Sequence, residues 1–317
     1  MLDSWIASCA GLDLPLSRER IKAWQLERLN QVLSYARNHS SFYCERFPGG
    51  PVASLAEFSG LPFTTPDDLR LHGNRMVCTD ASSIDRIVTL METSGSEGKP
   101  KRVFFTADDQ ERTIDYFHHG MLEFAKPGDR ALILFPGHSP GSLNVLLSEA
   151  LSRMDVTAEI FGFPSPEDYD TVIGRILTGR INYLVGPAPV IAAIAARSEK
   201  KGTADQLSEI IDAVLLAGSF VSDENCRIIS SLWHCRIDED YGMTETGLGG
   251  AVGCKVSGGY HTWESDLYYE IVDPLSGSPL PEGQYGELVV TTLCRKAMPF
   301  IRYRTGDISR IIPGPCA

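Results

Sequence analysis

Between Arg86 and Gly250 the chain alternates short apolar runs, rich in β-branched residues, with longer stretches of helical periodicity. The apolar runs predict strands at Ile87–Leu90, Ala131–Phe135, Thr157–Phe161, Tyr183–Gly186 and Ala213–Ala217. The stretches between them predict helices at about 107–125, 142–153, 168–178, 188–200 and 223–232. Such alternation is typical of βαβ units, whose right-handed crossovers build a largely parallel sheet. We therefore predict an α/β fold with a ligand site at the carboxyl edge of its strands.

The two flanks of this centre have different patterns. Residues 18–47 repeat apolar side chains with a period near that of an α-helix, which predicts an amphipathic helix, and Thr65-Pro66 predicts another helix start. After Gly250, the runs Tyr268–Val272 and Gly286–Leu293 alternate with turn residues and predict hairpins. We predict three parts, which are a helical and loop region at 1–85, the α/β core at 86–250 and a small β-rich subdomain at 251–317.

Charge and composition exclude several classes of protein. The 317 residues carry 29 Lys and Arg against 41 Asp and Glu, a formal charge of −12, which argues against nucleic acid as a partner. A membrane helix needs about 20 consecutive apolar residues, and no stretch of the sequence approaches that length. The 8 cysteines are too sparse for a secreted disulfide scaffold. We therefore expect a cytoplasmic protein without a membrane partner.

A Gly/Ser-rich segment follows the first predicted strand. Glycines let backbone amides approach a polyphosphate, hydroxyls donate further hydrogen bonds, and a lysine supplies positive charge. The residues of this candidate phosphate-binding loop are Thr93, Ser94, Gly95, Ser96, Glu97, Gly98 and Lys99. Its spacing is not that of a Walker loop, and a flexible surface turn is the alternative interpretation.

Two further segments carry residues suited to a nucleotide. In Asp240-Tyr241-Gly242-Met243-Thr244-Glu245, a tyrosine can stack on a purine, a threonine can bond a phosphate and a glutamate can hold Mg²⁺. In Arg302-Tyr303-Arg304-Thr305-Gly306-Asp307, the aspartate can accept hydrogen bonds from both ribose hydroxyls. Each segment alone also has a purely structural interpretation. The first could be a Gly-rich turn with a buried tyrosine, and the second a β-turn closed by an aspartate.

Together and in this order, the three segments resemble the signature of the adenylate-forming superfamily of acyl-CoA synthetases and adenylation domains. Within it, four segments and the N-terminal helix resemble the phenylacetate–CoA ligase branch. They are Gly259–Glu264, Tyr269–Pro274, Gly286–Leu293, Ala297–Asp307 and the helix Gln25–Phe47. The resemblance covers nearly the whole chain and implies the adenylate-forming fold, with a helical N-terminus, central parallel sheets and a β-rich subdomain.

The resemblance implies ATP-dependent activation of a carboxylic acid to an acyl-adenylate, with transfer to coenzyme A. By the same resemblance, residues 93–99 hold the β- and γ-phosphates, and Thr244, Glu245 and Lys99 act in catalysis, with Glu245 binding Mg²⁺. Gly218 and Ser219 flank the adenine, on which Tyr241 stacks. Asp307 takes the ribose hydroxyls. The further nucleotide contacts implied are Asp240, Gly242, Met243 and Arg304.

Two departures from the family pattern affect this expectation. The mobile C-terminal lid of the family, about a hundred residues long, carries a lysine for the adenylation step, and nothing after Asp307 can contain it. We therefore expect this chain to lack the lid and to bind nucleotide better than it turns it over. The branch places acyl-pocket residues at Phe135, His138 and Gly242, but residues 135–141 lack its Tyr-Gly run. An aryl acid is the first expectation, the identity of the acid stays open, and a solvated loop histidine is the alternative for His138.

Cys254, His261 and Cys316 are candidate ligands of a structural Zn²⁺, which some members of the branch carry. Two unrelated thiols and a hairpin histidine are the alternative. The sequence leaves open whether the acceptor is coenzyme A or the thiol of a carrier protein, whether the chain is a non-catalytic nucleotide- or acyl-binding homologue, and whether it forms a dimer.

Overall fold

The computed structural model describes residues 2–47, 49–90, 100–256 and 258–314. Contacts divide the chain into two compact units, each built from separate segments. We call them the α/β unit, Arg112–Met243 with Leu248–His261, and the N/C unit, Leu2–Glu111 with Thr244–Gly247 and Thr262–Ala317. The division predicted from composition, with boundaries after residues 85 and 250, stays a prediction.

The α/β unit is organised around a mostly parallel sheet. Among the described residues seven strands form it, in the order β4-β3-β5-β6-β7-β8-β9. Strands β4, β3, β5, β6 and β7 run parallel, and β8 is antiparallel to β7. Their bounds are β3 Arg130–Ile133, β4 Thr157–Ile160, β5 Tyr183–Gly186, β6 Ala213–Leu216, β7 Arg236–Tyr241, β8 Ala251–Gly253 and β9 Tyr260–Thr262. The predicted α/β fold with a parallel centre is therefore confirmed.

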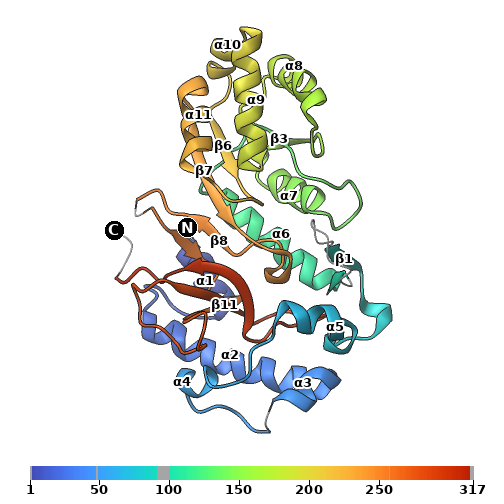
Figure 1. The fold of residues 1–317 in the computed structure, drawn as a ribbon, viewed down its shortest axis with the longest axis vertical. Coiled ribbons are helices and arrows are strands. Elements are labelled where there is room, and N and C mark those ends of the chain that lie inside the picture. Colours follow the sequence, from blue (N-terminus) through green and yellow to red (C-terminus); the bar gives the residue numbers. More distant parts are fainter. Residues whose placement is uncertain (1, 48, 91–99, 257, 315–317) are drawn as a thin grey trace. The chain divides into compact units, whose positions relative to one another are not determined.

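Helices cover this sheet (Figure 1). Their buried apolar side chains form one core with those of the strands. Leu132, Leu184 and Val214 of the parallel strands are fully buried in one core with Ile191 and Trp233, which come from two different helices. The indole Nε1 of Trp233 donates a hydrogen bond of 3.2 Å to Ser198 Oγ, so the polar edge of the buried ring is satisfied. The helices are α6 Ala107–Met121, α7 Leu143–Ser152, α8 Tyr169–Gly179, α9 Ala188–Lys201, α10 Ala204–Ser208 and α11 Asp223–Trp233, with the 3₁₀ turn η2 Pro166–Asp168.

One predicted member of the parallel sheet lies elsewhere. The run Ile87–Leu90 lies in β1 Arg86–Leu90, which pairs antiparallel with β2 Lys101–Phe105 in a separate two-stranded sheet. The expectation that this run joins the parallel sheet was therefore wrong. Its partner β2 follows Pro100 directly and was not predicted, because its two basic residues hide the short apolar end Val103–Phe105.

The N/C unit combines helices with a three-stranded antiparallel sheet, β10-β11-β12. The predicted helix at 18–47 is broken at Ser40, whose hydroxyl accepts from the Tyr43 N–H and starts a new helix. The predicted start at Pro66 is confirmed, since Thr65 and Asp68 form a reciprocal capping box. The elements are α1 Leu2–Ala10, α2 Arg18–His39, α3 Ser41–Arg46, α4 Leu55–Phe58, α5 Pro66–Met76, η1 Ala81–Ser83, η3 Thr244–Thr246, β10 Leu267–Val272, β11 Gly286–Thr292 and β12 Tyr303–Ser309.

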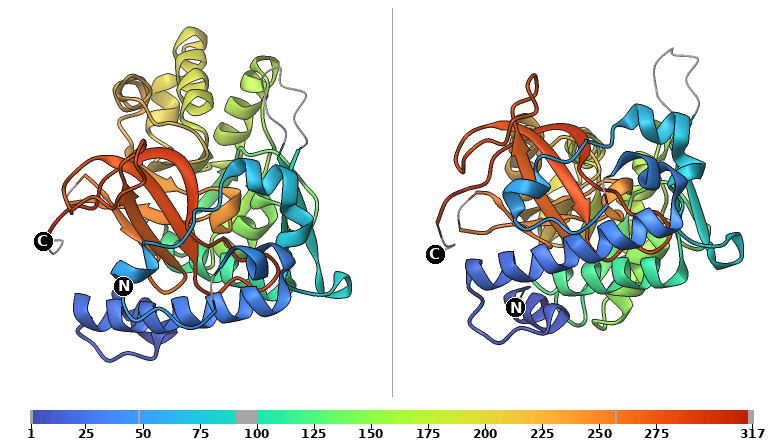
Figure 2. Two further views of the ribbon diagram at one scale, coloured as in Figure 1. Left: turned by 60° about the horizontal axis from the view of Figure 1, so that its bottom comes forward. Right: turned by 90° about the horizontal axis from the view of Figure 1, so that it is seen from below.

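Helices from the beginning of the chain pack in this unit against segments near its end (Figure 2). The Gln25 side-chain amide of α2 donates to the Glu264 carbonyl at 3.0 Å, and the Tyr43 hydroxyl of α3 donates to the Pro299 carbonyl at 2.7 Å. Thr64 forms an isolated parallel bridge with Tyr303 of β12. The core of the N/C unit is therefore assembled from residues more than 200 positions apart.

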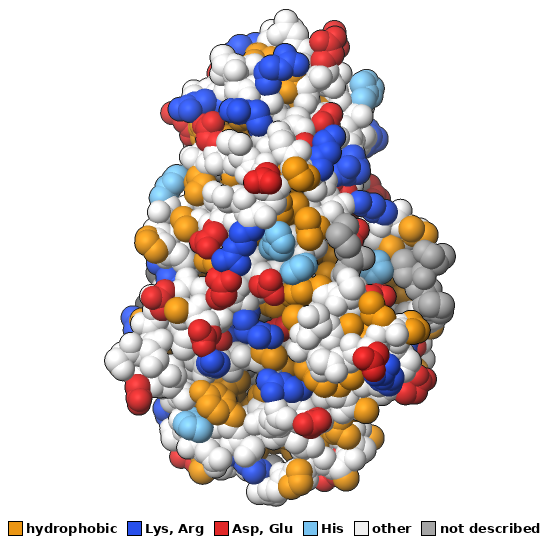
Figure 3. Space-filling model, turned by 180° about the vertical axis from the view of Figure 1, so that it is seen from behind, with side chains coloured by type: hydrophobic (Ala, Val, Ile, Leu, Met, Phe, Trp, Pro, Cys, Tyr) orange, Lys and Arg blue, Asp and Glu red, His pale blue; other side chains and the backbone are white. Residues whose placement is uncertain are grey.

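No helix in the described part of the chain is long and apolar enough to cross a membrane. On the face drawn in Figure 3, Lys and Arg side chains are interspersed with Asp and Glu side chains and not gathered into one basic area. This mixture agrees with the net negative charge of the sequence.

Candidate functional site

The predicted adenine-flanking residues follow β6, at the carboxyl edge of the parallel sheet. Leu216 of β6 lies opposite Glu239 of β7, so Gly218 and Tyr241, each two residues further on, leave adjacent strands at the same edge. Gly218 has a φ of +70°, and an added Cβ would lie 3.0 Å from the Phe135 ring. Ser219 Oγ accepts the Ala188 N–H at 3.2 Å. The structure therefore places Gly218, Ser219 and Tyr241 at one edge of the parallel sheet, and their contacts with adenine stay a prediction.

A glycine is required at position 242. A Cβ added to Gly242 would lie 2.4 Å from the backbone oxygen of Leu248, far inside van der Waals contact. The Leu248 N–H donates to the Met243 carbonyl at 2.9 Å, which closes the turn after Tyr241. Residues 241–243 are held by this close approach of two backbone segments. Whether the site residues Gly242 and Met243 contact nucleotide, and whether Gly242 also lines an acyl pocket, stay predictions.

Asp240, at the end of β7, has an unusual environment. Its Oδ1 accepts a hydrogen bond of 3.0 Å from the hydroxyl of Tyr116 on α6. The Tyr116 ring packs against Gly249, where a Cβ would lie 2.0 Å from it. Burial raises the pKa of Asp240 to about 8, and the Tyr116 hydrogen bond opposes the rise. Asp240 is therefore mainly protonated at neutral pH in this structure.

We expect the substitution Asp240→Asn to flatten the pH dependence of stability. The native carboxyl, with its pKa of about 8, holds a proton that the unfolded carboxyl has lost above about pH 4. The wild-type free energy of unfolding should therefore fall as pH rises from about 4 to about 8, by an amount on the order of a few kcal/mol. Urea midpoints measured between pH 5 and 9 test this, and equal slopes in both proteins would contradict it.

The two predicted acyl-pocket residues Phe135 and His138 begin the loop after β3. Phe135 is buried, and its carbonyl accepts from the Asn144 side-chain amide at 2.6 Å. The same amide donates to the Gly137 carbonyl at 2.7 Å, so one buried asparagine fixes the loop. The His138 ring lies against Gly162, where a Cβ would be 2.9 Å from Nε2. A role for either residue in binding an acyl group stays a prediction.

Glu245, the predicted Mg²⁺ ligand, is a buried carboxylate in the N/C unit. Its Oε1 accepts a hydrogen bond of 2.8 Å from the Tyr303 hydroxyl and lies 3.2 Å from Lys101 Nζ. The Glu245 side chain is only 3% exposed, so this carboxylate depends on the lysine charge for its stability. Burial, followed by the charge of Glu245, raises the pKa of Tyr303 above its ordinary value, which keeps the hydroxyl as a donor.

The carboxylate of Glu245 has the chemistry that Mg²⁺ requires, a charged hard oxygen, and Mg²⁺ commonly takes one or two carboxylates together with substrate phosphates. Lys101 and Tyr303 were not among the predicted site residues. Lys101 had a signal, since it repeats the basic residue of Lys99-Pro100-Lys101. Tyr303 lies within the third motif, but its contact with Glu245, 58 positions away in sequence, has no local signal.

The predicted phosphate-binding loop and the predicted zinc ligands gain no support from the described residues. Thr93–Lys99 and Cys316 are outside the described residues. Cys254 and His261 flank a turn in which the Cys254 N–H donates to the Gly259 carbonyl at 2.7 Å. Within residues 2–47, 49–90, 100–256 and 258–314, no three His, Cys, Asp or Glu side chains group to hold a metal ion. The zinc site therefore stays a prediction without structural support.

Arg304 and Asp307 both lie on β12 in the N/C unit. The guanidinium of Arg304 binds the Glu287 carboxylate, with Nε 2.9 Å from Oε2, and also the Pro274 carbonyl at 2.7 Å. The hydrogen bonds and charge of Glu287 raise the pKa of Arg304. Asp307 is exposed, and its N–H donates to Thr305 Oγ1 at 3.0 Å. A direct nucleotide contact by either residue stays a prediction.

Comparisons with known proteins show which proteins the sequence resembles. The sequence is 29% identical over 311 residues to a phenylacetate-coenzyme A ligase of Pseudomonas putida, covering 94% of this chain and 68% of the relative. It is 27% identical over 322 residues to the phenylacetate-coenzyme A ligase of Thermus thermophilus, covering 95% of this chain and 68% of that relative.

Solved structures show the same fold. A 2-hydroxyisobutyryl-CoA ligase in complex with 2-HIB-AMP and CoA superposes with a TM-score of 0.83 at 20% identity, over 93% of this chain and 64% of that one. The chain thus spans under two thirds of that structure, and the predicted adenylate-forming fold is confirmed. The family model for AMP-binding enzymes matches residues 43–294. The chain belongs to the AMP-binding enzyme family.

Proposed function

We propose that this protein activates a carboxylic acid with ATP and transfers the acyl group to coenzyme A. In the first step a carboxylate oxygen bonds to the α-phosphorus of ATP and pyrophosphate leaves, giving an acyl-adenylate. In the second step the thiol of coenzyme A bonds to the acyl carbon, AMP leaves and the thiol proton is released. The observation that carries the proposal is the buried Glu245 carboxylate, which lies within the family-matched segment and is held by Lys101 and Tyr303.

The roles of the residues follow from charge and geometry. Displacement at phosphorus needs positioning and neutralisation of negative charge more than a protein nucleophile. Lys101 and the Tyr303 hydroxyl hold one oxygen of Glu245 in place. Mg²⁺, when held by Glu245 and the phosphates, would stabilise negative charge that develops on the phosphoryl oxygens. Thr244, directly before Glu245, would contact the α-phosphate, and Lys99 would neutralise the outer phosphates.

The acid that we propose first is an aryl acid. The relatives named phenylacetate-coenzyme A ligase support this choice, as does Phe135, which follows β3 near the sheet edge. A neighbour in fold is named for 2-hydroxyisobutyryl-CoA, an aliphatic product, so short hydroxy acids belong in any test panel. Coenzyme A is the proposed acceptor, a carrier-protein thiol is the alternative, and a cytoplasmic location fits these substrates.

Calorimetric titration tests the proposal directly. The protein is titrated with ATP in the presence of Mg²⁺, and then with phenylacetate, benzoate and 2-hydroxyisobutyrate in the presence of a non-hydrolysable ATP analogue. We expect saturable ATP binding and tighter binding of one aryl acid when the analogue is present. Release of AMP that depends on coenzyme A then tests the acceptor. A folded protein that binds no ATP would overturn the proposal.

A further inference from the structure

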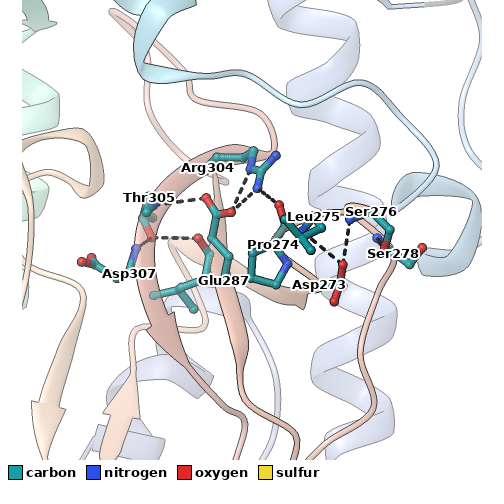
Figure 4. A network of polar contacts seen from close by, with 11 residues as sticks. Asp273, Pro274, Leu275, Ser276, Ser278, Glu287, Arg304, Thr305 and Asp307 are labelled. Carbon is teal, nitrogen blue, oxygen red and sulfur yellow. Dashed lines mark hydrogen bonds and ion pairs between the residues drawn. The ribbon is translucent and has the colours of Figure 1, made fainter.

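Two backbone segments of the N/C unit are connected to one buried carboxylate, Glu287 on β11 (Figure 4). The first, Arg304–Asp307 of β12, contacts Glu287 directly, and the second, the turn Asp273–Ser278 after β10, is connected to it through Arg304. Glu287 is 6% exposed, so its charge is almost completely removed from water. A buried carboxylate is stable only when its oxygens have charged or hydrogen-bonding partners, and Glu287 has both kinds.

The two carboxylate oxygens of Glu287 hold different parts of β12. Oε2 accepts from Nε of Arg304 at 2.9 Å and from a second nitrogen of the same guanidinium group, so two charge-assisted hydrogen bonds converge on one oxygen. Oε1 accepts the backbone N–H of Gly306 at 3.2 Å. One side chain therefore fixes both the side chain of Arg304 and the backbone that leads into Asp307.

This attachment coincides with an irregularity in the sheet. The pairing of β11 with β12 shifts register between Glu287 and Val289, and Gly306 has a φ of +81°. Thr305 Oγ1 donates to the Leu288 carbonyl at 2.8 Å and accepts the Asp307 N–H at 3.0 Å. A bulged strand turns its side chains in new directions, and here its backbone is tied down on both sides of Gly306. The exposed Asp307 side chain thus leaves from a fixed backbone position.

Arg304 extends the network to the second segment. Its guanidinium donates to the Pro274 carbonyl at 2.7 Å. That turn is closed by Asp273, whose Oδ1 accepts the N–H groups of Leu275 at 3.1 Å and Ser276 at 2.7 Å. The hydrogen bonds from Ser276 also lower the pKa of Asp273, so the turn is closed by a charged acceptor near neutral pH. Glu287 thus contacts the segment Arg304–Asp307 directly and is connected to the turn Asp273–Ser278 through Arg304.

We infer that Glu287 is a positioning residue for Asp307, and that it holds the Asp307 carboxylate in the orientation that takes the two ribose hydroxyls. The inference rests on the proposed function, in which Asp307 binds ribose. Glu287 itself touches no substrate in this assignment, and it acts through the Gly306 N–H and through Arg304. Its removal should weaken only the part of nucleotide affinity that depends on the ribose hydroxyls.

A pair of nucleotides separates this role from a general effect on folding. ATP and 2′,3′-dideoxy-ATP are each titrated with Mg²⁺ into the wild type, Glu287→Gln and Asp307→Asn, and the ratio of the two Kd values is compared. We expect the wild type to prefer ATP by about 10- to 100-fold, since hydrogen bonds to a carboxylate are strong. We expect this ratio to fall below about threefold in Glu287→Gln, as in Asp307→Asn.

The chain offers a matched control on the same sheet. Glu270 of β10 is 6% exposed and pairs with Arg302, its Oε2 lying 3.0 Å from Nε, two positions before Arg304. Glu270→Gln removes a comparable buried charge that bonds neither to Gly306 nor to Asp307 in the contacts of the described chain. We expect this variant to lose stability and to keep the wild-type preference for ATP.

Two further outcomes keep the inference testable. If Glu287→Gln does not fold, Arg304→Lys tests the same contact from the other side, because lysine keeps the charge and lacks the paired guanidinium donors. The preference of Arg304→Lys for ATP over 2′,3′-dideoxy-ATP should also fall. Retention of the wild-type ratio in Glu287→Gln or in Arg304→Lys overturns the inference and leaves the proposed function standing. A wild type that binds neither nucleotide overturns both together.

Discussion

The substitution Glu245→Gln should lower the rate of acyl-adenylate formation by about 100- to 1,000-fold, the range seen when one transition-state charge contact is removed. Glutamine has nearly the same size as glutamate but cannot offer Mg²⁺ a charged oxygen. It also leaves Lys101, 3.2 Å away in the wild type, without its anionic partner. Incorporation of labelled pyrophosphate into ATP, measured with the acid that binds most tightly, reports this step directly. The affinity for ATP without Mg²⁺ should change much less than the rate.

Glu282→Gln is a suitable control for this experiment. Glu282 lies on the surface of the same N/C unit, where its Oε1 is 2.8 Å from Arg18. Exposed pairs of this kind contribute about 0–1 kcal/mol, so we expect the rate and the melting temperature to stay close to those of the wild type. If Glu245→Gln keeps more than a tenth of the wild-type rate, Glu245 does not hold the catalytic Mg²⁺.

The substitution Gly242→Ala should abolish measurable nucleotide binding, which would be the largest effect on affinity among the variants considered. An added Cβ would lie 2.4 Å from the Leu248 carbonyl oxygen, and a backbone atom cannot rotate away as a side chain can. The turn that carries Tyr241 must then open. Forcing an atom into a filled space costs about 1–3 kcal/mol, so the protein should fold while this turn is displaced. Titration of ATP together with urea unfolding measures both quantities.

Gly174→Ala in α8 provides the comparison. An added Cβ at Gly174 meets no atom within 4 Å apart from the neighbouring backbone of its own helix, and alanine favours a helix by about 0.5–1 kcal/mol over glycine. We expect unchanged nucleotide affinity and equal or slightly higher stability. Wild-type affinity in Gly242→Ala would show that the tight turn plays no part in binding.

Local signals account for most of what the sequence predicted about the fold. Short apolar runs such as Tyr183–Gly186 are fully buried strands, and their composition is sufficient to identify them. The Thr65–Asp68 capping box is equally local, since its contacts span three residues. The wrong prediction concerns a strand whose sheet is determined by a partner strand elsewhere in the sequence. β1 carries a strand pattern like the others, and only its pairing with β2 excludes it from the parallel sheet.

The site shows the same division. The motifs around Tyr241, Glu245 and Asp307 can be read from the sequence because each places its chemistry within a few residues. Lys101 and Glu245 are 144 positions apart, and Glu287 is 19 positions from Gly306. Neither contact can therefore be predicted from a short sequence motif. Nothing in the residues next to Lys101 and Glu287 indicates which distant residue each of them contacts. Their roles become visible only when the strands that carry them are paired.

The assembly of the N/C unit from both ends of the chain has a consequence during synthesis on the ribosome. The Gln25 contact cannot form until Glu264, 239 positions later, has been synthesised. The Tyr43 contact likewise requires Pro299, 256 positions later. At 5–20 residues per second, this delay lasts roughly 10 to 50 seconds. In that time the apolar faces of α2 and α3 lack their final partners, while the contiguous strands β3 to β7 can already pair. The first helices to be made are therefore among the last to be buried, and their apolar faces are open to non-native contacts over this interval.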